Sequence, residues 1–511
     1  MKHIAKIFFS RIFWVAIAII IEISWVFVGI RWLQEVNTAI NSLMVAISLF
    51  VVLLIVNKSA NPSYKLAWTI LILAIPVFGL VIYFLLGKSK IAKDMEERFE
   101  KINHSANKKI PEDEVARNRL DAKDTMLSNQ SKYIRDYGMF PVYKNTKTVY
   151  FPSGESAFED IIKEIKNAKK YIFLEFFIIA KGNMWDTLLT LLEEKASEGL
   201  DVRLVYDDMG CITTLPHHFY KKLQEKGIKC ACFNPFRPIA NVILNNRDHR
   251  KIIVIDGNIG YTGGINIADE YINKIERFGY WKDTAIKCSG DGVMSFTVMF
   301  LQMWEVITKI HENLMDFLPE TYGNQCFESD GYVQPYSDTP LDNETVGENV
   351  YLNIINQAKD YVYIFTPYLI IDNEMMTALC LASKRGVDVR IVTPGIPDKK
   401  YIYLLSQSYY EELIMSGVSI YQYSPGFIHA KCMVSDDKVA VVGTINLDYR
   451  SLYLHFECGV WLSYCQTVLN IKEDAKKVME ESEKISLEFC RSRHFFVRIL
   501  QSVMRVLAPM L

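Results

Sequence analysis

The sequence predicts a duplicated α/β protein, with two similar domains whose mixed β-sheets are flanked by helices, preceded by N-terminal transmembrane helices. Apolar residues are concentrated in the first ninety residues, strand-like runs alternate with helical patterns from about Tyr150 onward, and this alternation occurs twice. The 511 residues include 57 basic and 59 acidic side chains, a balance that excludes a disordered chain or a basic nucleic-acid binder. Ten cysteines without a C-x-x-C pair are typical of reduced thiols in a cytosolic compartment.

Residues 1–90 are predicted to form a membrane anchor with apolar segments at 12–32, 40–56 and 66–87. Glu22 makes the first segment costly inside a bilayer. Lysines also precede the first segment and follow the third, and each cluster favours the cytoplasmic side. Three spans cannot satisfy both clusters. Either the first segment is interfacial or re-entrant, or one of the two lysine clusters lies on the side of the membrane away from the cytoplasm.

Two further segments flank the predicted domains. Residues 91–140 carry charges of alternating sign without a core periodicity, which predicts a helical or flexible linker along the membrane surface. Residues 491–511 place apolar side chains at helical spacing among several arginines, which predicts an amphipathic helix. This helix either lies in a membrane interface, with its arginines at the headgroups, or docks on the globular part.

The two α/β domains are predicted at residues 141–325 and 326–490. Gly199-Leu200-Asp201-Val202-Arg203 in the first matches Gly386-Val387-Asp388-Val389-Arg390 in the second. Each segment follows a helical stretch and opens an apolar strand. A duplicated domain is the simplest explanation.

A second repeat, at residues 249–266 and 429–446, carries chemistry. His249-x-Lys251, Asp256, Gly263 and Asn266 return as His429-x-Lys431, Asp436, Gly443 and Asn446. In both copies the aspartate follows the histidine by 7 residues and the asparagine follows it by 17, which excludes chance. Because residues two apart on a strand point to the same face, each histidine projects together with its lysine.

These side chains predict a metal-free anion site suited to a phosphodiester. One neutral imidazole can attack phosphorus while the other, protonated, gives a proton to the leaving oxygen. The lysines neutralise the charge that develops on the phosphate oxygens. Asparagine amides can donate to phosphate, and glycines let it approach the backbone. The predicted substrate-binding residues are therefore Asn266, Asn446, Gly263, Gly264, Gly443 and Thr444.

Four carboxylates complete the predicted site. Asp256 and Asp436 belong either to the catalytic set or, as the hairpin pattern around them favours, to a turn. Asp283 and Glu457 follow the two motifs at comparable distances, so we expect each to orient an imidazole. We expect no metal and no cofactor, because the sequence contains neither a Walker loop nor a carboxylate cluster for paired metals.

The repeated motif resembles the duplicated HKD motif of the phospholipase D superfamily, and its flanks resemble bacterial cardiolipin synthases. The matching segments of the first half are Asn246-Arg247-Asp248-His249-Arg250-Lys251, Tyr261-Thr262-Gly263-Gly264-Ile265-Asn266 and Trp281-Lys282-Asp283-Thr284. Those of the second are Gly426-Phe427-Ile428-His429-Ala430-Lys431, Gly443-Thr444-Ile445-Asn446-Leu447-Asp448 and Arg450-Ser451-Leu452. Near the N-terminus, Asn61-Pro62, Trp68, Pro76 and Gly79 resemble the family's membrane hairpin.

The resemblance implies transfer of a phosphatidyl group between two phosphatidylglycerol molecules, giving cardiolipin and glycerol. His249 would form a phosphohistidine and His429 would be the general acid. A hydrolytic phospholipase D, or a transferase to another alcohol, remains the alternative, and a non-catalytic membrane scaffold is disfavoured because both motifs are complete.

The resemblance also implies that phosphatidylglycerol and membrane lipid are the partners, rather than nucleic acid. It implies a multi-pass protein of a bacterial cell membrane with cytoplasmic catalytic domains. One position departs from the family, because His455 stands where an asparagine is usual. This histidine either tunes the acceptor site or is a packed, hydrogen-bonded residue.

Overall fold

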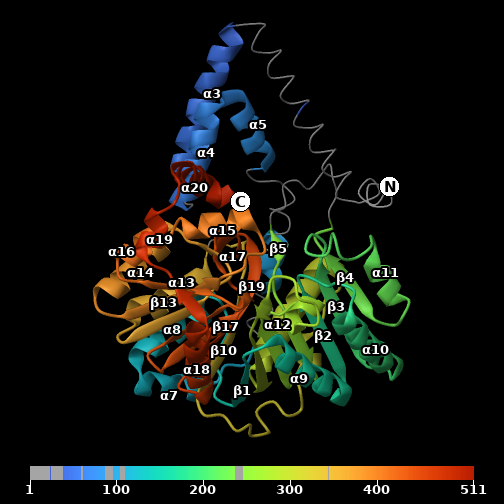
Figure 1. The fold of residues 1–511 in the computed structure, drawn as a ribbon. Coiled ribbons are helices and arrows are strands. Elements are labelled where there is room, and N and C mark those ends of the chain that lie inside the picture. Colours follow the sequence, from blue (N-terminus) through green and yellow to red (C-terminus); the bar gives the residue numbers. More distant parts are fainter. Residues whose placement is uncertain are drawn as a thin grey trace.

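The computed structural model describes residues 38–58, 61–86, 96–103, 110–235, 246–342 and 344–510, together with Ser24. Two α/β halves form the body of the molecule, and a group of N-terminal helices projects away from it (Figure 1).

The first half is built on a mixed sheet with the strand order β1-β9-β7-β6-β2-β3-β4. Strands β2, β3 and β4 are parallel, and the β6–β7 hairpin runs antiparallel beside β2. The strands are β1 (Thr146–Phe151), β2 (Tyr171–Phe176), β3 (Asp201–Asp207), β4 (Lys229–Phe233), β6 (Ile252–Ile255), β7 (Ile259–Gly263) and β9 (Ala285–Gly290).

Both faces of this sheet are buried. Alternate residues of β2 contribute to different cores: Ile172 and Leu174 pack with helices α9 (Gly154–Asn167) and α10 (Asn183–Ser197), whereas Phe173 faces α12 (Val293–Thr308). Burial on two faces explains why these strands are continuous apolar runs in the sequence.

The second half repeats the first, strand for strand. Its order is β10-β19-β17-β16-β11-β13-β14, with β20 added at the edge, so the predicted duplication with mixed sheets is confirmed. The strands are β10 (Tyr332–Asp338), β11 (Tyr361–Phe365), β13 (Asp388–Pro394), β14 (Ser419–Tyr423), β16 (Cys432–Ser435), β17 (Val439–Gly443), β19 (His455–Ser463) and β20 (Ser482–Lys484). Flanking helices include α13 (Val346–Gln357), α14 (Asn373–Lys384) and α18 (Gln466–Glu480).

Two short strands cross between the halves. Strand β5 (Arg247–Asp248) of the first half pairs with the start of β19, and β15 (Gly426–Ile428) of the second half pairs with β8 (Tyr280–Lys282). Each crossing strand directly precedes one of the two repeated histidines. The crossings therefore carry both motifs to the interface between the halves.

The described N-terminal residues form helices α3 (Thr38–Val56), α4 (Pro62–Ala74) and α5 (Pro76–Leu86). The predicted apolar segment 66–87 is divided between α4 and α5, because the helix breaks at Pro76, whose ring removes a backbone donor and restricts the preceding residue. Gly79 brings α5 against α4, since a Cβ there would lie 2.6 Å from the Ile72 Cα.

The predicted membrane spans are not confirmed. Apart from Ser24, the predicted segment 12–32 lies outside the described residues. Within the part of the chain that is described, no helix combines the length and apolar character needed to cross a membrane.

Of the helical or flexible linker predicted for residues 91–140, the described residues 110–140 follow the helical alternative, but they are part of the folded body rather than a separate linker. Helices α7 (Glu114–Lys123) and α8 (Thr125–Tyr137) pack on the second half, with Leu127 and Ile134 in its core. The Trp461 indole N–H donates to the Gln130 side chain over 3.0 Å. Charged residues on the exposed face of α8 mask its buried stripe in the sequence.

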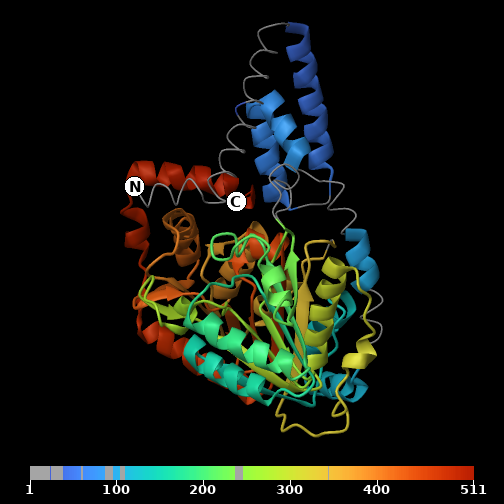
Figure 2. The same cartoon turned by 90° about the vertical axis from the view of Figure 1, so that its right-hand side faces the viewer.

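The predicted C-terminal amphipathic helix is helix α20 (Phe495–Leu507). It lies between the body and α3–α5, with its axis crosswise to theirs (Figures 1 and 2). The helix is docked, because the Gln501 amide donates to the Leu404 carbonyl over 2.9 Å. It nevertheless leaves apolar side chains exposed, among them Phe495, Phe496 and Leu500.

Candidate active site

The two repeated histidines are buried at the interface between the halves. The main-chain N–H of His249 donates to the Phe456 carbonyl over 3.0 Å, and that of His429 donates to the Lys282 carbonyl over 2.7 Å. Both bonds extend the crossing strands by one residue. Each imidazole is thus held by the backbone of the opposite half.

The orienting carboxylates also come from the opposite half. His249 Nδ1 lies 2.8 Å from Glu457 Oε1, and His429 Nδ1 lies 2.7 Å from Asp283 Oδ2. The structure therefore brings Asp283 and Glu457 to the imidazoles, but crosswise. A carboxylate on Nδ1 keeps the proton there and leaves Nε2 free to act on a substrate.

The two carboxylates are supported differently. Asp283 Oδ1 accepts from the Thr284 main-chain N–H at 2.8 Å, and a Cβ at Gly264 would lie 2.0 Å from that oxygen. In the second half Thr444 stands at the equivalent position, and its hydroxyl donates to Glu457 Oε2. Thr444 thus holds one carboxylate and Gly264 leaves room for the other. Their predicted contact with phosphate stays a prediction.

Gly263 and Gly443 also have a packing role. A Cβ at Gly263 would lie 2.3 Å from the Thr284 carbonyl oxygen, and one at Gly443 would lie 2.4 Å from that of Cys458. Both glycines therefore permit close approach of the neighbouring strand. The prediction that they also open the backbone to phosphate stays a prediction.

The predicted asparagines occupy unlike surroundings. Asn266 Oδ1 accepts from the Ile178 N–H at 3.0 Å, and its amide donates to the Tyr271 hydroxyl at 2.8 Å. The Tyr271 ring in turn packs edge-on against His429, with ring centroids 5.4 Å apart. Asn446 is buried, and its oxygen has no hydrogen-bond partner among the described residues. The predicted donation from the Asn446 amide to phosphate stays a prediction, because the unpaired atom is the oxygen, which accepts hydrogen bonds as phosphate oxygens do.

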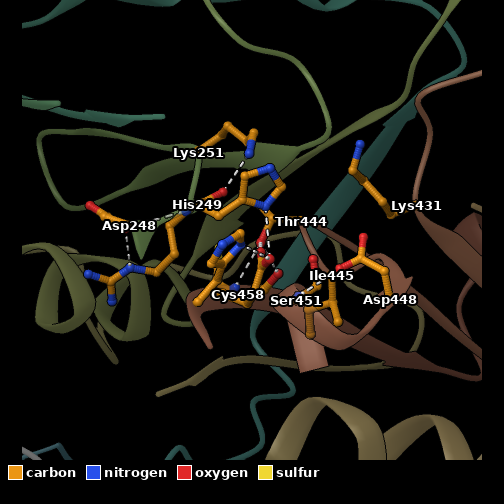
Figure 3. Close-up of polar contacts among 12 residues, drawn as sticks. Asp248, His249, Lys251, Lys431, Thr444, Ile445, Asp448, Ser451 and Cys458 are labelled. Atoms are coloured by element: carbon orange, nitrogen blue, oxygen red, sulfur yellow. Dashed lines mark hydrogen bonds and ion pairs between the residues drawn. The ribbon is translucent and has the colours of Figure 1, made fainter. Parts of the chain in front are cut away.

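Two lysines supply positive charge to the site. Lys251 and Lys431 are buried, and each ammonium donates to the carbonyl of the histidine two residues before it. Figure 3 shows the Lys251 contact beside His249 and Thr444. Burial lowers the pKa of Lys251 to about 8 and that of Lys431 to about 7. An anionic ligand would restore the charged form of both.

The imidazoles are neutral in the free protein. Burial, with help from the nearby lysines, lowers the pKa of His249 well below its ordinary value and that of His429 to about 4. Burial raises the pKa of Glu457 to about 7. Burial would also raise the pKa of Asp283, but the nearby His429 and Lys431 outweigh this effect and hold the pKa of that carboxyl below its ordinary value.

Asp256 and Asp436 do not lie with the histidines, so their place in the predicted catalytic set is wrong. Each sits in the hairpin turn beyond β6 or β16, at the other end of the strand from its histidine. Their carboxylates accept main-chain N–H bonds of 2.7–3.0 Å from Lys169, Lys170 and Tyr171, and from Lys359, Asp360 and Tyr361, respectively. These bonds tie each hairpin to the start of the central strand.

His455 lies beside the first imidazole. Its ring centroid is 5.5 Å from that of His249, and its Nδ1 is 3.9 Å from Glu457 Oε1. The side chain is buried, yet neither ring nitrogen has a hydrogen-bond partner in the described part of the chain. The expectation of a packed residue holds, whereas the expected hydrogen bonds are missing.

Sequence reasoning missed the aromatic walls of the site. Phe177 packs edge-on against His249, with ring centroids 5.0 Å apart, while Trp281 and Phe427 flank His429 at 5.5 and 5.9 Å. Phe427 could have been found, because it lies two residues before His429 and so shares its face of the strand. Phe177 and Trp281 carry no such signal, because they come from other segments that meet the histidines only in the fold.

Comparison with known proteins agrees with this geometry. The family model described as "Cardiolipin synthase, PLD-like domain" matches residues 161–278 and 351–479, one match in each half. A second model, described as "Phospholipase_D-nuclease N-terminal", matches residues 44–88. The duplicated domains are therefore phospholipase D-like.

Full-length relatives define the family further. The chain is 31% identical to a cardiolipin synthase of Alkalihalophilus pseudofirmus, over 91% of this chain and 92% of the relative. It is 32% identical to one of Geobacillus kaustophilus, over 94% and 95%. The fold resembles the crystal structure of a phosphatidylserine synthase from Haemophilus influenzae, with a TM-score of 0.54 and 16% identity over 75% of this chain and 97% of that one.

The fold and site define a phosphatidyltransferase of the phospholipase D superfamily. Within that superfamily, the chain belongs to the cardiolipin synthase family.

Proposed function

We propose that this protein transfers a phosphatidyl group from one phosphatidylglycerol to a second, forming cardiolipin and releasing glycerol. One observation carries the proposal: two buried imidazoles, each oriented by a carboxylate of the opposite half, share an interface with two buried lysines. This set supplies a nucleophile, an acid and charge neutralisation without a further group.

In the first step His249 Nε2 attacks phosphorus and the bond from phosphorus to the glycerol oxygen breaks. The resemblance to the superfamily assigns the attack to His249. His429 gives the leaving oxygen its proton, which the imidazole can hold once the substrate phosphate raises its pKa. In the second step the hydroxyl of another phosphatidylglycerol loses its proton to His429 and displaces the histidine, which completes the transfer.

Lys251 and Lys431 neutralise the phosphate through both steps. Both side chains are buried, so holding them in the charged form costs free energy in the free enzyme, and an anionic phosphodiester offsets that cost. This preference for anions disfavours headgroups that carry an ammonium of their own.

The site is expected to work at a bacterial membrane surface, with a multi-pass anchor and cytoplasmic catalytic domains. Helices α3–α5 expose large apolar side chains such as Leu43, Phe50 and Leu53. Helix α20 lies crosswise to them and exposes Phe495 at 67% and Phe496 at 71%. If α3–α5 insert into the bilayer, α20 lies in the plane of its interface.

The catalytic proposal is tested with detergent-solubilised protein and phosphatidylglycerol as the only lipid. Mass spectrometry should find cardiolipin and free glycerol with the wild type, and neither with His249→Ala or His429→Ala. Phosphatidic acid without cardiolipin would instead establish the hydrolytic alternative.

The membrane proposal is tested by flotation with anionic vesicles. A variant carrying Phe495→Asp and Phe496→Asp should bind vesicles more weakly than the wild type while turning over phosphatidylglycerol normally in detergent. Unchanged flotation would assign all membrane contact to the N-terminal helices.

A further inference from the structure

His455 is an unusual neighbour for a catalytic imidazole. A buried polar side chain without a hydrogen bond costs roughly 1–3 kcal/mol, so each such group calls for an explanation. Both ring nitrogens of His455 are in this state. Within the described residues, one ligand atom each from His249, His455 and Glu457 lies within 4.8 Å of the others, and all three side chains are buried.

We propose that His249, His455 and Glu457 form an inhibitory site for a divalent transition-metal ion of the Zn²⁺ class. Two imidazoles and one carboxylate are a ligand set that Zn²⁺ accepts, with a fourth position left for water. The proposal concerns regulation of the proposed phosphatidyl transfer and adds no metal to its chemistry.

The geometry is close to that of a bound ion. Tetrahedral Zn²⁺ with bonds of about 2.1 Å holds its ligand atoms roughly 3.4 Å apart. His249 Nδ1 and Glu457 Oε1 are 2.8 Å apart, and His455 Nδ1 is 3.9 Å from the same oxygen. The His249–Glu457 pair would have to open by about 0.6 Å and the His455–Glu457 pair to close by about 0.5 Å. No hydrogen bond to a described residue opposes the movement of His455.

An ion at this position would prevent His249 Nε2 from attacking phosphorus. It would displace the single ring proton that His249 Nδ1 shares with Glu457 Oε1, and that proton would move to Nε2, so that the ring stays neutral. A protonated Nε2 has no lone pair for phosphorus. Inhibition therefore comes from a change of tautomer, with the ion on the side of the ring away from the substrate.

The surrounding charge limits the affinity. The ammoniums of Lys251 and Lys431 repel a divalent cation, whereas the carboxylate of Glu457 attracts it. We therefore expect binding in the micromolar range. An asparagine at position 455 would remove one imidazole ligand and leave only two.

The experiment combines activity with direct metal binding. Glycerol release from phosphatidylglycerol micelles is measured across a buffered Zn²⁺ series, and Zn²⁺ content is measured by equilibrium dialysis of the same full-length protein. Co²⁺ provides a spectroscopic probe, because tetrahedral Co²⁺ absorbs visible light. The dialysis and the Co²⁺ spectrum report on the site even if phosphatidylglycerol is not the substrate.

His455→Asn is the test variant. His455→Gln replaces it if His455→Asn unfolds at a lower temperature than the wild type. A matched control is His311→Asn, since His311 forms an exposed histidine–carboxylate pair with Glu305 at 3.0 Å. Without metal, all variants should turn over normally. Half-inhibition of the His455 variants should need at least about tenfold more Zn²⁺ than the wild type and the control.

Three results would overturn the proposal. One is a wild type unaffected by Zn²⁺; another is equal inhibition of the wild type and the His455 variants. The third is a wild type that binds no more Zn²⁺ or Co²⁺ than those variants.

Discussion

The crosswise carboxylates predict that two conservative substitutions have unequal effects. Asp283→Asn keeps an oxygen for the Thr284 N–H, which now bonds Oδ1 at 2.8 Å, and so turns its NH₂ group toward His429 Nδ1. An NH₂ donor at that position makes Nδ1 an acceptor and moves the ring proton to Nε2. The imidazole is then in the wrong tautomer for general acid–base work.

Glu457→Gln does not force this change. The Glu457 partner is the Thr444 hydroxyl, which can accept from an NH₂ group and donate instead to the Cys458 carbonyl at 3.1 Å. The glutamine oxygen can therefore stay on His249 Nδ1. Only the charge is lost, and with it part of the stabilisation of the imidazolium-like transition state.

The magnitudes follow from these two situations. A wrong tautomer in a histidine–carboxylate pair costs about 10⁴ in kcat, or about 5.5 kcal/mol, whereas loss of one charge-assisted hydrogen bond costs about 1.5–3 kcal/mol. We expect kcat for cardiolipin formation to fall roughly 10⁴-fold in Asp283→Asn and about 10- to 100-fold in Glu457→Gln. Initial rates from phosphatidylglycerol micelles measure both, and thermal unfolding checks that both variants are folded. Equal losses, or a smaller loss in Asp283→Asn, would refute the reasoning.

Three further predictions concern other parts of the site. Gly264→Ala should lower kcat by at least about 100-fold with little change in melting temperature, because its methyl group displaces the Asp283 carboxylate; near-normal kcat would show that the carboxylate can move without loss. The value of kcat/KM should fall as pH rises through 7 to 8, because Lys431 and Lys251 have pKa values of about 7 and about 8 and lose their ammonium form there; a pH–rate profile that is flat in this window contradicts it. Asp256→Asn should cost about 1–3 kcal/mol of unfolding free energy with kcat in folded protein nearly unchanged, because an amide cannot accept all the N–H bonds made by the carboxylate; a large loss of kcat at normal stability would return this residue to the catalytic set.

The sequence predicted the duplicated sheets and the hairpins, because their apolar runs and turns are local patterns. It also identified Asp283 and Glu457, since each keeps a similar distance along the chain from its motif. The sequence could not predict which imidazole each carboxylate contacts. Spacing along the chain does not show that strands cross between the halves. The packing role of Gly264 could not be predicted for a related reason. Gly264 has no side chain where the Asp283 carboxylate lies, and Asp283 is remote from it in sequence.

The near-symmetry of the site raises the question of how two equal motifs can take unequal roles. The motif residues themselves do not distinguish the halves, since each histidine has a lysine, a crossing strand and a carboxylate. The differences lie in the surrounding residues. Thr444 occupies in the second half the position that Gly264 occupies in the first, and His455 adjoins the His249 imidazole but not the His429 imidazole. A hydroxyl that can reverse its hydrogen bond lets Glu457 change protonation during the cycle, whereas the fixed N–H beside Asp283 favours a permanent carboxylate. If His249 and His429 have the proposed roles of nucleophile and acid, the residues that support the two carboxylates supply the asymmetry that those roles require.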